Sequence, residues 1–464
     1  MLKRKIENQL IEWKNQTNHK PIVIKGIRQC GKTFIVKKFA EAHYKHVVYL
    51  NFAQKPELSI PFEGSLEVDD IIMGITAMVK GAMFEPGKTC LILDEIQDCP
   101  QARTALKFFK LDNRFDVICT GSLLGIKGYG IKHPNGEHEM PRSIPVGYET
   151  ILTMYPLDFE EFVLANGENP QLIEAARDAW ESRKPLAKPL HERLRKLFRF
   201  YLVVGGMPAA VQVYLDTKDI RLVLREQKKI LVDYRKDITQ YDEQNAMRIR
   251  EVFDRLAPEL NKKNKRFYAD SVSEGGRFDR LEDEFLWLKE SGVGIPVYNV
   301  EEPRVPLKLA EKPNFFKLFM NDVGLLSAMY MGGIQVKILN GETEINFGSV
   351  YENAVAQELT AHGFAPTYYN SSAHGEIDFV VERDGRILPI EVKSGKHYKR
   401  HRALAHMMDE PEFGLSSAVV FDDDALGVEG GVFYAPIYMM MFLERERLPD
   451  KMIYDIGDPI DFRS

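Results

Sequence analysis

The chain has 464 residues, of which 44% are hydrophobic and 28% charged, so it is globular in composition and too long for a single core. Lysine and arginine number 62 against 68 aspartate and glutamate, and the net charge of -6 argues against a protein that coats nucleic acid indiscriminately. The four cysteines form no C-x-x-C pair and no uncharged stretch is long enough to span a bilayer, so we expect a cytoplasmic protein with no membrane partner.

Residues 2–15 place apolar side chains at helical spacing, which predicts an amphipathic helix ahead of the first strand. That strand runs into Gly26-Ile-Arg-Gln-Cys-Gly-Lys-Thr33, which fits the phosphate-binding pattern G-x-x-x-x-G-K-[ST]. Its glycines let the backbone wrap round an anion, and the following helix points its positive end at the same place. We expect Lys32 to reach the outer phosphates of ATP and Thr33 to offer its hydroxyl to Mg²⁺. The residues expected to contact the nucleotide are Gly26, Ile27, Arg28, Gln29, Cys30, Gly31, Lys32, Thr33 and Phe34.

Further apolar runs are separated by helical segments, which is typical of a parallel sheet covered on both faces and predicts an α/β fold. These runs lie at 47–52, 89–97 and 115–122. Asp94 and Glu95 come where the second run ends, beside the phosphate loop. An acid there often only caps a helix, but beside this loop we interpret Asp94 as a Mg²⁺ ligand and Glu95 as the base that orients or deprotonates the attacking water. The third run ends in Ser122, which is a candidate contact of the γ-phosphate and equally a candidate turn or helix cap.

Residues 127–149 are rich in glycine, histidine and proline and are expected to form a loop or hairpin. Arg142 in this region and Arg103 ahead of it are two candidates for an arginine finger, although surface arginines are common. From Tyr155 the pattern is helical as far as about residue 240, with a Gly/Pro break at 203–208.

The next region has a different pattern of predicted elements. It contains two helical stretches, a basic cluster between them and an extended segment at the end. These lie at 247–260, 261–266, 277–290 and 292–300. The order of helix, helix and β-ribbon matches a winged helix-turn-helix, in which Arg277, Arg280 and Lys289 would lie on or near the recognition helix. Basic helices are also ordinary solvated surfaces, and winged helices also bind proteins, so DNA binding by this region stays one of two alternatives.

Charged residues recur in an apolar setting after residue 347. Glu352 lies near the start of a predicted helix, Asp378 lies within an apolar strand, and Glu391 and Lys393 share one face of the next strand. We expect the four to meet at one end of a hairpin, where the three carboxylates would hold a divalent metal and the lysine would activate water or stabilise phosphate charge. Charges at strand ends are also common without a function. The pattern favours a nuclease-like fold and leaves open whether it cleaves.

Together these motifs resemble those of the prokaryotic AAA-type ATPases whose C-terminal half is a domain of unknown function, over most of the chain. Besides the phosphate loop, the residues that carry the resemblance are Leu93-Asp-Glu-Ile-Gln97, Thr120-Gly-Ser-Leu-Leu124, Tyr155-Pro-Leu-Asp-Phe-Glu-Glu-Phe162, Gly205-Gly-Met-Pro208, Asp322-Val-Gly-Leu-Leu326, Tyr351-Glu-Asn353, Glu376-Ile-Asp378 and Ile390-Glu-Val-Lys-Ser-Gly395. The resemblance implies an ATPase core and an end similar to the restriction endonucleases of the PD-(D/E)xK type. For ATP and Mg²⁺ it points to Lys32, Thr33, Asp94 and Glu95, and for the nuclease-like site to Glu352, Asp378, Glu391 and Lys393.

The predicted organisation is an α/β P-loop core of AAA type at 1–162, a helical lid-like region at 163–241, a winged-helix-like region at 242–312 and a nuclease-like α/β domain at 313–464. We expect a Mg²⁺-dependent ATPase that couples hydrolysis to conformational change, with DNA as a candidate target. Two alternatives stay open, namely an ATP-set switch whose nuclease-like domain only holds a partner, and an ATP-gated metal-dependent nuclease. By analogy with AAA-type enzymes that need a neighbour's arginine, a homo-oligomer is a further expectation.

Overall fold

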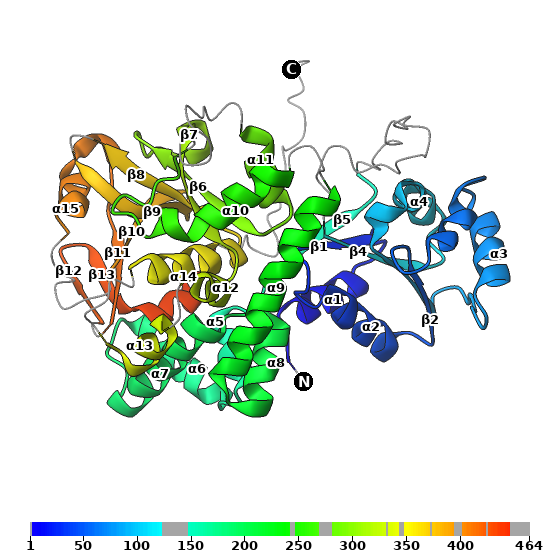
Figure 1. Ribbon diagram of the computed structural model, residues 1–464, viewed down its shortest axis with the longest axis horizontal. Helices are drawn as coiled ribbons and strands as arrows, with labels where there is room; N and C mark the ends of the chain where they lie inside the picture. Colours follow the sequence, from blue (N-terminus) through cyan, green and yellow to red (C-terminus); the bar gives the residue numbers. More distant parts are fainter. Residues whose placement is uncertain are drawn as a thin grey trace, which may run out of the picture.

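The computed structural model of the protein describes residues 2–122, 147–241, 246–268, 281–330, 333–342, 348–371, 374–393, 401–423 and 426–445 (Figure 1). Arg142, Arg277 and Arg280, to which the sequence assigns candidate roles, lie outside these residues. No helix in the described ranges combines the length and the apolar composition needed to cross a lipid bilayer.

The N-terminal part is built on a five-stranded sheet in the order β2-β3-β4-β1-β5, with all neighbouring strands parallel. The strands are β1 (Ile22–Lys25), β2 (His46–Asn51), β3 (Thr89–Asp94), β4 (Asp116–Gly121) and β5 (Thr150–Thr153). β3 is buried along its whole length, as expected for a strand covered on both faces. The predicted α/β class with a parallel sheet is confirmed. β4 lies between β1, which leads into the phosphate loop, and β3, which ends in the two acids.

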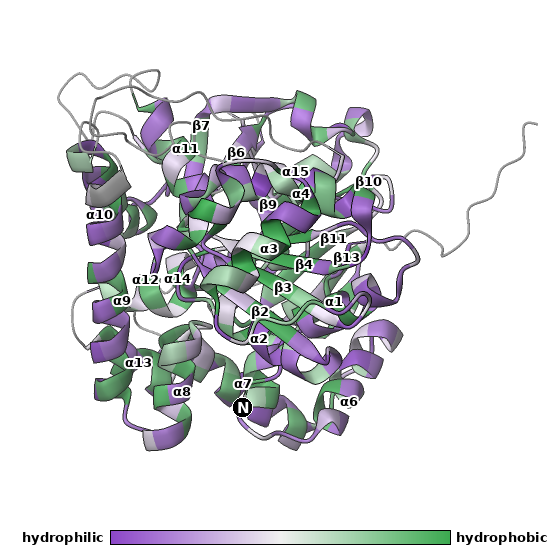
Figure 2. Ribbon diagram, turned by 90° about the vertical axis from the view of Figure 1, so that its right-hand side faces the viewer, coloured by the Kyte–Doolittle hydropathy of each residue, from purple (hydrophilic) through white to green (hydrophobic). Residues whose placement is uncertain are grey.

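Helices cover both faces of this sheet. They include α1 (Ile6–Asn15), α2 (Lys32–His43), α3 (Val68–Met78) and α4 (Pro100–Asp112). Side chains of α1 and α2 share one buried core with Ile22 and Ile24 of β1, whereas side chains of α3 and α4 share another with Val23 of the same strand. Figure 2 shows the apolar strands β3 and β4 inside a mostly hydrophilic outer layer. The alternation along β1 therefore explains why both faces need a helical layer.

A series of helices follows the sheet, as the pattern from Tyr155 predicts. They are α5 (Phe159–Ala165), α6 (Pro170–Ser182), α7 (Lys188–Val204), α8 (Pro208–Thr217), α9 (Ile220–Tyr241), α10 (Ala246–Leu260) and α11 (Glu282–Glu290). α9 has 22 residues and runs between the N-terminal sheet and the C-terminal part of the molecule in Figure 1.

The C-terminal part is built on an eight-stranded mixed sheet in the order β12-β13-β11-β10-β9-β8-β6-β7. Its strands are β6 (Gly294–Val300), β7 (Glu311–Met320), β8 (Thr367–Ser371), β9 (Gly375–Arg383), β10 (Arg386–Val392), β11 (Ala418–Asp422), β12 (Gly427–Glu429) and β13 (Val432–Pro436). Its helices are α12 (Val323–Met329), α13 (Ile334–Asn340), α14 (Gly348–Ala361) and α15 (Arg402–Asp409). One continuous apolar core runs from α1 and α2 through α7 to one face of this sheet.

The end of the predicted winged-helix-like region differs from the structure. The segment expected as the β-ribbon, 292–300, forms β6, which pairs antiparallel with β7 and parallel with β8 inside the large sheet. A boundary at residue 312 would therefore cut through β7. The physical reason is that Ile295 of β6 and Phe319 of β7 belong to the large apolar core that extends into this sheet.

α14 is buried on nearly all sides and is held by polar side chains. Asn353 donates to the Met320 carbonyl at 2.9 Å and accepts from its N–H at 2.8 Å. Gln357 donates to Tyr201 Oη at 2.8 Å and accepts from the Val323 N–H at 2.9 Å. Because buried polar groups must find partners, these bonds fix α14 against both the helical region and the C-terminal sheet.

The Gly205-Gly206 break fits closely against the start of α12. Buried Asp322 accepts hydrogen bonds from the Gly206 N–H at 2.6 Å and the Leu325 N–H at 2.8 Å, so it caps α12 and ties it to the break. A Cβ on Gly324 would lie 2.5 Å from the Gly205 nitrogen and 2.6 Å from its Cα. The two segments therefore need glycine where their backbones meet.

We expect Gly324→Ala to lower the free energy of unfolding by about 3 kcal/mol, because the added methyl group meets backbone atoms that cannot rotate away. Chemical denaturation monitored by circular dichroism measures this change. Gly427→Ala is the matched control, since a Cβ there has no neighbour within 4 Å. Its expected effect is within about 0.5 kcal/mol. A Gly324→Ala variant as stable as this control would contradict the close packing of the two segments.

Candidate functional site

The phosphate loop joins β1 to α2. Gly31, the N-cap residue of α2, has φ +96°, a left-handed conformation that favours glycine. A Cβ on Gly26 would lie 2.1 Å from the Met154 carbonyl oxygen, so the loop also packs closely against the end of β5. Within the described chain no side chain caps α2, and the N–H groups of its first turn need other partners. With the helix dipole, these groups form an anion-binding geometry.

Lys32 lies inside this loop. Its side chain is buried, and its Nζ donates to the carbonyl oxygens of Gly26 at 2.8 Å and Ile27 at 3.0 Å. Neutral carbonyls do not cancel the charge of an ammonium group, so the loop keeps a positive centre. The ammonium group of Lys32 therefore lies inside the loop, and its contact with the outer phosphates stays a prediction.

Asp94 is buried at the end of β3 and collects several donors. Its carboxylate accepts from Thr33 Oγ1 at 3.0 Å, Tyr49 Oη at 2.6 Å and Asn51 Nδ2 at 2.9 Å, and also from Thr120 Oγ1. The structure thus brings together Thr33 and Asp94, the two side chains that the sequence assigns to Mg²⁺. The supporting residues were not predicted as a group, although Asn51 and Thr120 lie at the carboxyl ends of the strands flanking β3.

Glu95 and Ser122 have features of functional positions. Glu95 has φ +54°, which few non-glycine residues adopt, and its Oε2 accepts from Gln97 Nε2 at 2.6 Å. Ser122 Oγ is buried and has no hydrogen-bond partner among the described residues. A buried hydroxyl without a partner is costly, so a ligand oxygen at this place would satisfy it.

A cleft of about 620 Å³, an ordinary size for a small-molecule site, opens over the loop. On the loop side it is lined by Arg28, Gln29, Gly31, Lys32, Thr33, Phe34 and Glu95. From the opposite side α9 contributes Asp233, Lys236 and Asp237. Arg28 forms an ion pair with Asp237, and Gln29 Nε2 donates to Asp233 Oδ2 at 3.1 Å. Sequence reasoning missed these α9 residues, whose one signal is the run Tyr234-Arg-Lys-Asp237 at the end of the helical pattern.

Some predicted residues do not line this cleft, and Ser122 instead lines a smaller cavity with Arg28 and Asp237. Ile27 and Cys30 have buried side chains, so they can offer a ligand only their backbone. Arg103 forms a two-pronged ion pair with Glu149, with Nη2–Oε1 at 2.7 Å and Nε–Oε2 at 3.2 Å. That pairing ties α4 to the segment before β5 and leaves Arg103 away from the lining of the cleft.

The four residues predicted for the nuclease-like site meet between α14, β9 and β10. Glu352 and Glu391 are buried. Asp378 Oδ2 accepts from the Val392 N–H at 2.8 Å, which holds this carboxylate beside β10. Lys393 forms an ion pair with Glu391, and this contact confirms that the two side chains share a face.

Two lysines that the sequence did not single out complete this cluster. Lys317 of β7 is fully buried, with its Nζ 2.7 Å from Glu376 Oε1 and 3.8 Å from Glu352 Oε2. Lys265, which sequence reasoning placed in a basic cluster of the winged-helix-like region, pairs with the other oxygen of Glu352. The signal for Lys317 is its place inside the otherwise apolar run Phe315-Phe-Lys-Leu-Phe319, where a lone charge needs partners.

The cluster separates the pKa values of its members. Burial, with the nearby charge of Asp378, raises the pKa of Glu391 to about 8. Burial would also raise the pKa of Asp378, but the positive charges of the lysines, Lys317 above all, hold it below its ordinary value. Carboxylates are the ligands that a hard divalent cation prefers, but among the described residues Glu352, Asp378 and Glu391 do not bring three ligand atoms within 4.8 Å of one another. Lysines balance part of their charge, since Lys265 and Lys317 contact Glu352 and Lys393 pairs with Glu391.

Comparison with protein families matches residues 18–163 to a family described as an AAA domain. Residues 195–336 and 347–439 match two families that are each described as a domain of unknown function. A comparison with curated proteins gave no match.

Solved structures similar to the chain include a Walker-type ATPase of Pyrococcus abyssi, at 14% identity and a TM-score of 0.39, over 71% of this chain and 96% of the other. AMPPCP-bound DnaA from Aquifex aeolicus is 11% identical with a TM-score of 0.27, over 62% and 86% of the two chains. PCH-2 of C. elegans is 13% identical with a TM-score of 0.24, over 50% and 68%.

Proposed function

We propose that the AAA-type P-loop domain at residues 18–163 binds ATP with Mg²⁺ and hydrolyses it, and that this cycle moves the helical region against the C-terminal sheet. In this proposal the loop N–H groups and Lys32 hold the outer phosphates, and Thr33 and Asp94 hold Mg²⁺, which neutralises phosphate charge. Glu95 orients or deprotonates the attacking water. DNA is the candidate target.

The observation that carries the proposal is the cleft shared by the phosphate loop and α9. Asp233 and Asp237 of α9 engage Gln29 and Arg28, so they occupy donors beside the place of a triphosphate. Phosphates entering the loop would repel both carboxylates and compete for the same donors, which favours a shift of α9 on binding. Because α9 packs against α12, such a shift would reach the C-terminal part.

Nucleotide binding is tested by Lys32→Ala, which we expect to weaken ATP binding about 10- to 100-fold, since a hydrogen bond from a charged donor contributes about 1.5–3 kcal/mol. Isothermal titration calorimetry measures the dissociation constant. Lys38→Ala is the matched control on the same helix, because Lys38 Nζ pairs with Glu7 at 2.7 Å and does not line the cleft. Unchanged binding by Lys32→Ala would contradict a nucleotide site in the loop.

Hydrolysis and its target are tested by measuring ATP turnover with and without double-stranded DNA. Turnover that DNA accelerates would support a DNA-coupled ATPase. Turnover that DNA leaves unchanged would support the ATPase and overturn DNA as its target. Tight ATP binding without turnover under either condition would overturn the hydrolysis and leave an ATP-set switch.

The buried cluster of Glu352, Asp378, Glu391 and Lys393 favours a second candidate function, an ATP-gated and metal-dependent nuclease. Opening of the Lys265–Glu352 ion pair would be its gate. Incubation with plasmid DNA, Mg²⁺ and ATP tests this function, with Asp378→Ala as the inactive comparison. Nicking that persists in Asp378→Ala would rule out this cluster as its source.

A further inference from the structure

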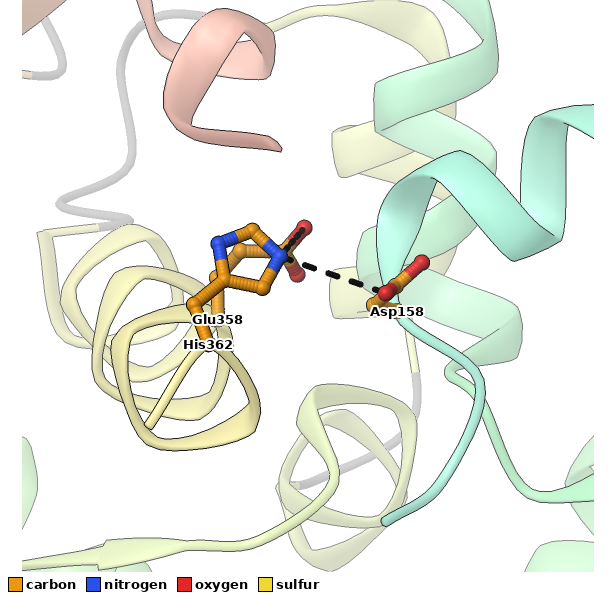
Figure 3. Close-up of side chains that lie close together, drawn as sticks. All are labelled: Asp158, Glu358 and His362. Carbon is orange, nitrogen blue, oxygen red and sulfur yellow. Dashed lines mark ion pairs between the residues drawn. The ribbon is translucent and has the colours of Figure 1, made fainter. Parts of the chain in front are cut away.

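A third group of titratable side chains lies outside both sites described above. Asp158 immediately precedes α5, whereas Glu358 and His362 lie one turn apart at the end of α14 (Figure 3). One possible ligand atom from each residue lies within 4.8 Å of the others. The three side chains are only 7%, 2% and 8% exposed. The group therefore sits in the interior, where the chain leaving the nucleotide-binding domain meets the C-terminal part.

His362 turns an unsatisfied nitrogen towards the two acids. Its Nδ1 lies 2.9 Å from the Leu443 carbonyl oxygen, so Nδ1 carries a proton and donates it to that bond. Its Nε2 is buried and has no hydrogen-bond partner among the described residues. Figure 3 shows the His362 ring facing Asp158 and Glu358. Nε2 lies 3.9 Å from Asp158 Oδ2 and 3.8 Å from Glu358 Oε1, beyond hydrogen-bond distance. In a neutral imidazole that donates through Nδ1, the other nitrogen, Nε2, presents a lone pair.

We propose that Asp158, Glu358 and His362 bind one divalent transition-metal ion of the Zn²⁺ class. Two ligand atoms that each lie about 2.1 Å from the same Zn²⁺ are roughly 3–4 Å apart. His362 Nε2 lies 3.9 Å from Asp158 Oδ2 and 3.8 Å from Glu358 Oε1, and the two carboxylates lie within 4.8 Å of each other. One imidazole with two carboxylates suits Zn²⁺ better than Mg²⁺ or Ca²⁺, which prefer oxygen ligands alone. The bond from Nδ1 to a backbone carbonyl is the outer contact that orients metal-binding histidines.

Backbone donors hold both carboxylates in place. Asp158 Oδ1 accepts from the Glu161 N–H at 2.8 Å, and Glu358 Oε2 accepts from the Phe159 N–H at 3.3 Å. One cation competes for the site, because Lys5 Nζ lies 2.7 Å from Asp158 Oδ2. Lys5 also lies 2.7 Å from Glu160 Oε2, and its side chain is 42% exposed. Lys5 therefore has a second partner and room to leave Asp158 when a metal ion binds.

An ion at this place would join segments that are far apart in the sequence. Asp158 follows the N-terminal sheet, His362 directly follows α14, and the Leu443 carbonyl belongs to the segment after β13. The ion would cross-link the nucleotide-binding domain to the end of α14. This is the same helix that carries Glu352 of the second cluster. This role goes beyond ATP hydrolysis and does not depend on it.

The test uses the full chain after treatment with a chelator. Zn²⁺ is added in a background of millimolar Mg²⁺, which fills sites that accept oxygen ligands, and the Zn²⁺ that stays bound after desalting is measured by atomic spectroscopy. We expect one Zn²⁺ per chain and a higher unfolding temperature. Co²⁺ in place of Zn²⁺ should give the visible absorption bands of a mixed nitrogen and oxygen site. Wild-type protein that retains no Zn²⁺ would overturn the proposal. A water molecule bridging His362 Nε2 and the two carboxylates would then explain the space between them.

Variants locate the ion. His362→Gln should weaken Zn²⁺ binding by more than about 100-fold, since even outer contacts of a metal site are each worth 10- to 100-fold. His191→Gln is the matched control, because His191 Nδ1 contacts Tyr438 Oη at 2.9 Å. Lys5→Met removes the competing cation and should tighten binding several-fold, which keeps the test decisive if His362→Gln does not fold. Equal retention by wild type and His362→Gln, or weaker binding by Lys5→Met, would overturn the assignment.

Discussion

Replacing Glu95 with glutamine is expected to slow ATP hydrolysis by about 10²- to 10⁴-fold and to leave ATP binding within about twofold of wild type. The reason is that glutamine keeps the size of the side chain and can still accept the hydrogen bond that Glu95 Oε2 receives from Gln97 Nε2. It cannot take a proton from water. The backbone at Glu95, with φ +54°, is compatible with glutamine as it is with glutamate, so the substitution need not move it.

Turnover and binding must be measured on the same preparation to test this expectation. Glu85→Gln is the matched control, because Glu85 pairs with Lys45 at the surface and lies away from the cleft. If Glu95→Gln turned over ATP within tenfold of wild type, another group would have to activate the water. If it lost ATP binding as well, Glu95 would instead have a role in holding the nucleotide.

The phosphate loop and the acids beside it could be predicted because their chemistry is local. The loop lies between Gly26 and Thr33 in one contiguous stretch, and the strand that ends in Asp94 lies in a parallel sheet whose carboxyl ends share an edge. These rules place Thr33 near Asp94, and the structure has them 3.0 Å apart. The same reasoning put Glu391 and Lys393 on one face of a strand, which their ion pair confirms.

Contacts between segments far apart in the chain could not be predicted in this way. From the sequence, Asp233 and Asp237 are indistinguishable from ordinary polar residues on a helix surface. Their spacing does not indicate that α9 lies across the phosphate loop. In the sequence, Lys265 is part of a basic cluster, whereas in the structure it forms an ion pair with Glu352. The periodicity of apolar residues indicates which face of a helix or strand is buried. It does not indicate which other element packs against that face.

The predicted β-ribbon at 292–300 lies inside the large sheet for a related reason. A β-ribbon that stands alone and a hairpin at the edge of a large sheet have the same alternating pattern and the same turn residues. The choice between them depends on which apolar surface is available, and here Ile295 and Phe319 join a core that already extends through α7 and α14. The hairpin therefore adds β6 and β7 to the C-terminal sheet.

Lys317→Met is expected to lower the free energy of unfolding by about 3–5 kcal/mol, because breaking a buried ion pair by removing one partner leaves an uncompensated buried charge. Burial would lower the pKa of Lys317, but the carboxylates of Glu352, Glu376 and Asp378 raise it, so the lysine is charged in the folded protein. Methionine fills a similar volume and leaves those carboxylates with fewer cations. Lys312→Met, on the same strand, is the matched control. Lys312 is 41% exposed and pairs with Glu301 at the surface, so its expected effect is within about 1 kcal/mol.

The pH dependence of this loss identifies its cause. Burial, followed by the charge of Asp378, already raises the pKa of Glu352, and removal of Lys317 should raise it further. A carboxyl group whose folded pKa lies above its unfolded value binds its proton more tightly in the folded state, so folding loses stability as the pH rises from the unfolded value through the folded one. The loss of stability in Lys317→Met should therefore be smaller near about pH 5 than near about pH 8, and Lys317→Met/Glu352→Gln should recover part of it.

Chemical denaturation at both pH values in the presence of a chelator measures these differences. An equal loss of unfolding free energy at the two pH values would contradict the electrostatic explanation. Lys317 would then stabilise the sheet through packing, and the other residues of the cluster would balance its charges.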